Sequence, residues 1–94
     1  MIVRVVKMQF DGNFIDEFKK LFNEVKPQIA KSEGCLGVKL LQHETDLSLF
    51  FTISEWRSAE DLENYRKSDL FIETWANVKP NFSAKAEAWS LLEQ

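Results

Sequence analysis

Arg4 lies within an otherwise apolar and β-branched run at the start of the 94-residue chain, where a charge is unusual. Because side chains alternate along a strand, Arg4 shares one face with Ile2, Val6 and Met8. A guanidinium on an apolar face must be paired or must await an anionic ligand. Arg4 is therefore either a strand-end charge that reaches solvent or pairs with a glutamate, or a contact to a negatively charged substrate.

His43 and Tyr65 are the other side chains that could exchange a proton or a hydrogen bond with a substrate. An imidazole titrates near neutral pH, so His43 is a candidate general base if the fold brings it to a pocket. Its place beside Glu44, at the end of a predicted strand, fits a solvated loop histidine as well. Tyr65 could hydrogen-bond a substrate hydroxyl through its phenol.

The segment SEWRSAEDLENYRKSDLFIETWANVKP, residues 54–80, contains two Trp, the only Tyr and one Phe. Tyr65 and Trp75 fall on the inner sides of two short predicted helices, where aromatic residues usually fill a core. The alternative is that they line a flat cavity that accepts an aromatic ligand. If so, we expect its walls to be formed by Phe18, Phe71 and Trp75.

The sequence contains no glycine-rich phosphate loop, no serine nucleophile elbow and no set of His and Cys residues at metal-binding spacing. With one His and one Cys, an ordinary zinc or haem site is hard to build. Cys35 has no base beside it and fits a buried bystander thiol. We therefore expect neither a metal nor a cofactor.

The net charge of −3, with no basic cluster longer than Lys19-Lys20, argues against nucleic-acid binding. The single cysteine allows no intrachain disulfide. Arg4 and Lys7 interrupt the apolar run at the N-terminus, so this run does not resemble a signal peptide. No apolar run reaches the length of a membrane span. These features predict a cytoplasmic protein whose partner is a small apolar or aromatic molecule rather than nucleic acid or a membrane.

Strands and helices alternate along the sequence in a simple order. Four segments predict strands: residues 2–10, 36–43, 49–55 and 84–92. Apolar residues at helical spacing predict one amphipathic helix over residues 14–29 and two shorter helices, capped by Ser58 and Ser68. The order predicts one α+β domain, residues 1–94, with the ferredoxin-like split βαβ arrangement: a four-stranded antiparallel sheet with helices on one face.

The strands are apolar on both faces, which this arrangement does not explain by itself. The third strand places Phe50 and Trp56 on one side and Leu49, Phe51 and Ile53 on the other. Helices can cover only one of these faces, and the other would remain a large exposed apolar patch. We therefore expect a homodimer whose two sheets pack face to face.

The chain resembles the antibiotic biosynthesis monooxygenase (ABM) family over nearly its whole length. The resemblance is carried by MIVRVVKMQF, EGCLGVKLLQ, FFTISEWRSAEDLENYRKSDLF and AEAWSLL. It implies a dimeric α/β barrel, with a pocket between helices and sheet in each homodimer subunit. Some members of this family oxidise electron-rich aromatic or quinol substrates with O₂ and without metal or flavin, and others degrade haem.

Haem-degrading members use an Asn on the first strand, a Trp on the first short helix and a His on the next. The matching positions here hold Val6, Tyr65 and Trp75, so the resemblance ranks haem degradation low. It favours a cofactor-independent monooxygenase, with Arg4 stabilising a substrate anion. A non-catalytic homodimer that binds a small molecule is the alternative.

Overall fold

The computed structural model describes residues 1–94 and contains four strands and three α-helices, in the order β1-α1-β2-β3-α2-α3-β4. Their bounds are β1 Ile2–Gln9, α1 Ile15–Ala30, β2 Cys35–Gln42, β3 Leu49–Trp56, α2 Ala59–Arg66, α3 Asp69–Val78 and β4 Glu87–Leu91. Short 3₁₀ turns, Gly12–Phe14 and Lys79–Asn81, precede α1 and follow α3. The α+β, ferredoxin-like arrangement predicted from the sequence is confirmed.

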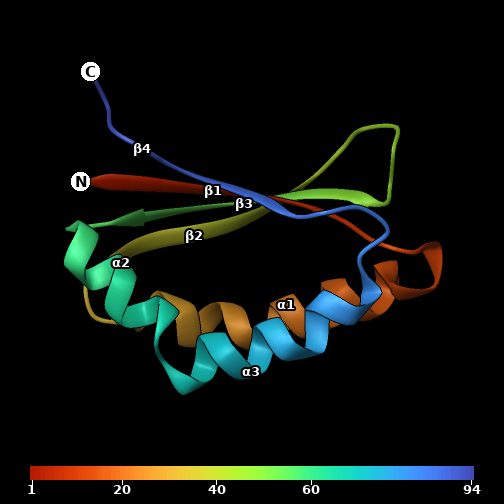
Figure 1. Ribbon diagram of the computed structural model, residues 1–94, viewed down its shortest axis with the longest axis horizontal. Coiled ribbons are helices and arrows are strands. Elements are labelled where there is room, and N and C mark those ends of the chain that lie inside the picture. The colour runs from red at the N-terminus through yellow and green to blue at the C-terminus, as the bar shows by residue number, and fades with distance from the viewer.

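The strands form one antiparallel sheet in the order β2-β3-β1-β4. Figure 1 shows the sheet as one layer and all three helices as a second layer on one of its faces. The opposite face, called here the open face, carries no helix. None of the helices combines the length and apolar character that crossing a membrane requires.

The core lies between the sheet and the helices. Phe50 and Trp56 of β3 are completely buried, and Phe18 of α1 packs edge-on against Phe50 with ring centroids 5.0 Å apart. Trp56 donates a 2.9 Å hydrogen bond from Nε1 to Ser54 Oγ, so its burial leaves no polar atom unsatisfied. The faces predicted for the third strand are confirmed, because Leu49, Phe51 and Ile53 are only half-buried.

The two short helices begin at the predicted serine caps. Ser58 Oγ accepts a hydrogen bond from the Asp61 N–H, and Ser68 Oγ accepts one from the Phe71 N–H. Gly34, which precedes β2, has φ +79°, and a Cβ there would overlap the Asp61 carboxylate. Only glycine therefore fits at position 34, where the backbone passes against the Asp61 side chain of α2.

The last strand is shorter than predicted: it begins at Glu87 rather than at residue 84. Lys7 of β1 pairs with Glu87, and Phe10 pairs with Phe82. These two pairs are three residues apart on the first segment but five residues apart on the second. The two extra residues cannot stay in register, so the chain bulges out of the sheet between Ser83, whose N–H still donates to the Gln9 carbonyl, and Glu87. Ala86 consequently lies beside the cavity described below.

The open face is apolar, as the strand pattern predicts. On β4, Trp89 is 42% exposed and Leu91 is 49% exposed, and they pair with Val5 and Val3 of β1. Leu41 of β2 pairs with Phe51 of β3 on the same face and is 45% exposed. Exposed apolar side chains on the edge strands β2 and β4, with half-buried ones on β1 and β3 between them, make this face largely apolar, a feature that usually marks an interaction surface.

Candidate functional site

A cavity of about 300 Å³ lies between the helix layer and the helix-covered face of the sheet. Fourteen of its twenty lining residues are hydrophobic, so polar groups there are few and conspicuous. Its volume falls at the lower end of the range for small-molecule pockets, about 300–1,000 Å³. All strands except β2 and all three helices contribute at least two lining residues, and β2 contributes Val38.

Arg4 projects into this cavity from β1 and has no acidic partner. Its Nη1 donates a 3.0 Å hydrogen bond to Ser90 Oγ of β4, and it takes part in no ion pair. Partial burial lowers the pKa of Arg4, the nearby Arg66 lowers it further, and Glu63 opposes the shift. A guanidinium has five N–H donors, so Arg4 keeps most of its hydrogen-bonding capacity and its charge for a ligand.

Tyr65 reaches the cavity from α2 with its ring held between two aromatic neighbours. It stacks on Trp56, with ring centroids 4.8 Å apart and planes 25° apart, and meets Phe71 edge-on at 5.3 Å. Burial, with a smaller contribution from Cys35, raises the pKa of Tyr65 to about 12. Its hydroxyl has no hydrogen-bond partner within the chain, although it is not fully enclosed. At neutral pH it is therefore a protonated donor rather than a base.

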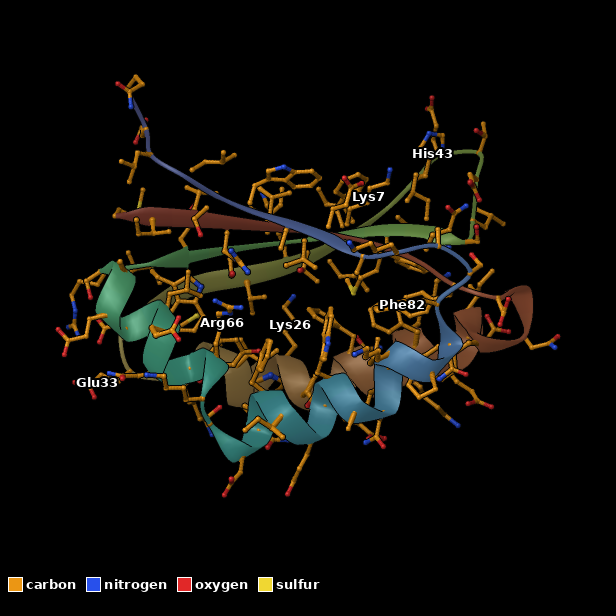
Figure 2. All side chains as sticks on the ribbon, viewed as in Figure 1. Lys7, Lys26, Glu33, His43, Arg66 and Phe82 are labelled. Atoms are coloured by element: carbon orange, nitrogen blue, oxygen red, sulfur yellow. The ribbon has the colours of Figure 1, made fainter.

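Arg66, which the sequence analysis did not single out, also lines the cavity. Figure 2 shows it on the side of α2 that faces the sheet. Its Nη1 lies 3.3 Å from Glu63 Oε2, and its side chain is 44% exposed, so it borders the cavity and also contacts solvent. Leu62 lies one turn earlier on the same side of α2 and is buried. The four-residue spacing from Leu62 was therefore the feature of the sequence that could have indicated that Arg66 faces inward.

The three aromatic residues predicted as walls all border the cavity. Phe71 and Trp75 of α3 stack almost parallel, with planes 8° apart and ring centroids 5.9 Å apart. Phe18 of α1 is 3% exposed, so most of its ring belongs to the core. The cavity thus has aromatic walls on the helix side, formed chiefly by α3.

His43 lies outside the cavity, in the hairpin between β2 and β3. Its Nδ1 accepts hydrogen bonds from the backbone N–H groups of Thr45 and Asp46, at 3.1 and 2.9 Å. Figure 2 shows it beyond the sheet on the side away from the helices. The condition for a role as base, that the fold brings His43 to the pocket, is not met within one chain.

No carboxylate faces the cavity as a substitute base. Glu87 is among the lining residues, but its carboxylate lies 3.6 Å from Lys7 Nζ, and register places both side chains on the open face. The chain also has no group of three or more His, Cys, Asp or Glu residues that could hold a metal ion. The polar groups available to a ligand are therefore Arg4, Arg66, the Tyr65 phenol and neighbouring hydroxyls.

The chain matches one family model and is similar in fold to many solved structures. The family model described as antibiotic biosynthesis monooxygenase matches residues 1–77. A crystal structure of an antibiotic biosynthesis monooxygenase superposes with a TM-score of 0.93 at 16% identity, covering 100% of this chain and 99% of that chain.

Two further solved structures show how widely the fold is shared. A conserved protein from Methanosarcina mazei Go1 has a TM-score of 0.91 at 22% identity, covering 100% of this chain and 94% of its own. The Rv0793 protein from Mycobacterium tuberculosis has a TM-score of 0.89 at 14% identity, covering 99% and 93%. No curated protein matches the chain. At these identities the structures establish a common fold alone.

Proposed function

Because the chain belongs to the antibiotic biosynthesis monooxygenase family, we propose that it is a cofactor-independent monooxygenase acting on a small aromatic or quinol-type substrate. The observation that carries this proposal is an aromatic-walled cavity that contains an unpaired guanidinium and a free phenol hydroxyl. Such a cavity can hold a flat ring, exclude water from it and stabilise negative charge on one of its oxygens.

In this chemistry the substrate supplies the electrons. Arg4 favours the anion of a bound phenol or enol and thereby lowers its pKa, and Tyr65 donates a hydrogen bond to the same oxygen. Since no base lines the cavity, the proton leaves to solvent. The ring anion reduces O₂ and bonds to one of its oxygen atoms, and a proton returns from solvent to the other. The O–O bond then breaks: one oxygen stays as a carbonyl on the ring carbon, and the other leaves as water with that proton and the hydrogen of the same ring carbon.

Oxygen uptake and product formation with a panel of anthrones and quinols test the proposal. We expect oxidation above the rate in buffer, with kcat/KM lowered about 10- to 100-fold in Arg4→Gln and less in Tyr65→Phe. Arg57→Gln is the matched control, because Arg57 pairs with Asp61 and Glu33 at the surface. Oxidation at buffer rates across the panel would refute an oxygenase of this class.

The lack of a base in the cavity favours a second candidate, a non-catalytic protein that binds a small apolar or aromatic molecule. Tight binding of a ligand without turnover, in the wild type and in both variants, would support it. Haem degradation ranks lower, because Val6, Tyr65 and Trp75 stand at the positions where haem-degrading relatives use Asn, Trp and His.

We also propose that the protein is a homodimer whose open faces pack together. The apolar open face motivates this, and a domain of 94 residues gains stability when such a face is covered. Trp89→Lys should convert the dimer to monomers in sedimentation experiments at micromolar concentration. Ile72→Lys, which replaces an exposed apolar residue of α3, should leave the dimer intact. A monomeric wild type would refute the proposal.

A further inference from the structure

The cavity carries a positive charge that the chain itself does not neutralise. Arg4 has only the neutral Ser90 hydroxyl as a partner. Arg66 has Glu63, but Glu63 is half exposed and does not line the cavity. The one acidic lining residue, Glu87, directs its carboxylate to Lys7. Two guanidinium groups therefore border the cavity with no carboxylate inside it.

The polar groups gather at one end of the cavity. On the sheet, Arg4 stands in register between Ser54 of β3 and Ser90 of β4, which forms a polar row across three strands. The next pair on this face, Val6 and Thr52, still carries one hydroxyl, and four residues beyond Arg4 on β1, Met8 pairs with Phe50 and both are buried. The sheet side of the cavity thus changes from cationic and hydroxyl-bearing to wholly apolar.

The helices repeat this division. Tyr65 and Arg66 come from α2, and Tyr65 stacks on Trp56, which pairs with Ile2 at the Arg4 end of β1. The Phe71 and Trp75 rings come from α3, and Trp75 reaches toward Phe82 at the other end, with ring centroids 5.5 Å apart. The helix layer therefore places Tyr65 and Arg66 at the Arg4 end, where Trp56 and Phe71 flank the Tyr65 ring, and its aromatic rings continue through Trp75 to Phe82 at the other end.

We infer that the ligand of this cavity is an aromatic acid: a flat apolar ring system whose carboxylate lies between Arg4 and Arg66. A guanidinium matches a carboxylate with two parallel hydrogen bonds, and the protonated Tyr65 hydroxyl can donate a third. A carboxylate is already ionised at neutral pH, so the absence of a base is no obstacle to its binding. This inference deepens the proposed function, because it rests on the proposal that the substrate binds in this cavity. It does not require that the substrate is oxidised.

Three naphthalene derivatives of similar shape test the inference: 2-naphthoate, 2-naphthamide and 2-naphthylmethylamine, which are anionic, neutral and cationic. Binding to the wild-type protein is followed by quenching of Trp fluorescence and confirmed by calorimetry. We expect naphthoate to bind about 10- to 100-fold more tightly than naphthamide, the range for hydrogen bonds to charged groups, and the amine to bind least. Equal affinities for naphthoate and naphthamide, or no binding of either, would overturn the inference.

The arginine variants decide whether the two guanidiniums cause the preference. Arg4→Gln should bring the naphthoate-to-naphthamide ratio near one, and Arg66→Gln should lower it about 3- to 10-fold. Arg57→Gln, which removes the same charge from the surface, should leave the ratio unchanged. Because Arg66 is half exposed, its variant should fold even if Arg4→Gln does not. A preference that survives Arg66→Gln and Arg4→Gln alike overturns the inference.

Binding and oxidation can fail separately. Naphthoate preference without any oxygen uptake from the quinol panel would leave the aromatic-acid site standing and refute the oxygenase. Oxidation of neutral quinols at rates that neither arginine substitution changes, with no preference for naphthoate, would support the oxygenase and refute the aromatic-acid site.

Discussion

Tyr65 offers a direct test of the cavity's environment, because it is the only tyrosine in the chain. The ultraviolet absorbance of tyrosinate therefore reports the ionisation of this one residue. Burial raises the pKa of Tyr65 to about 12, against an ordinary value of 10.0. We expect the folded protein to titrate near pH 12 and the protein in denaturant to titrate near pH 10.

The same shift predicts how stability depends on pH. The folded state holds the Tyr65 proton more tightly than the unfolded state, so the stabilising effect is complete below about pH 10 and is lost as the pH rises toward 12. One pKa unit corresponds to about 1.4 kcal/mol, so the free energy of unfolding should fall by roughly 2–3 kcal/mol across this window. Other contributions to the pH dependence of stability in this range must be subtracted.

Tyr65→Phe provides that subtraction. Urea unfolding curves at several pH values between 9 and about 12 should show a steeper loss of stability for the wild type than for the variant. Circular dichroism followed with absorbance separates ionisation from unfolding, since tyrosinate should form only near pH 12 or when the fold is lost. Tyrosinate appearing near pH 10 with the circular dichroism spectrum intact would refute the burial of the Tyr65 phenol in the folded protein.

Two substitutions outside this residue test the packing that shapes the site. Gly34→Ala should lower the free energy of unfolding by about 1–3 kcal/mol, because the positive φ and the Asp61 carboxylate both exclude a Cβ. Gly12→Ala, where a Cβ meets nothing within 4 Å, should change it little in the same urea titration. Ser54→Ala should cost about 1–3 kcal/mol by thermal or urea unfolding, since it leaves the buried Trp56 N–H without its acceptor. An unchanged midpoint for Gly34→Ala or Ser54→Ala would contradict the packing described for that residue.

The sequence contained enough local information to predict the architecture. Alternating and helical periodicities depend on which side of an element each residue occupies, and they identified the β-α-β-β-α-α-β order and both serine caps. They also predicted that Phe50 and Trp56 share one face of the third strand and Phe51 the other, and the structure shows that Phe50 and Trp56 lie on the buried, helix-covered face. The family match confirms the relationship that the local motifs indicated.

The sequence was less informative where residues distant in the chain meet. The start of β4 was predicted too early. Residue types do not show that the chain between Phe82 and Glu87 has two residues more than the segment of β1 that it pairs with. Arg66 looked like an ordinary charged residue on a helix surface, and only the packing of α2 over the sheet brings it to the same cavity as Arg4.

His43 and Arg4 illustrate the division most clearly. Both are polar residues on or next to strands, and the sequence could name each as a candidate without placing it. The strand pattern fixed which face Arg4 occupies, because alternation is a property of the backbone. Whether that face closes over a cavity, and whether the hairpin returns His43 to it, depends on how sheet and helices pack, so only the tertiary structure decided that Arg4 enters the site and His43 does not.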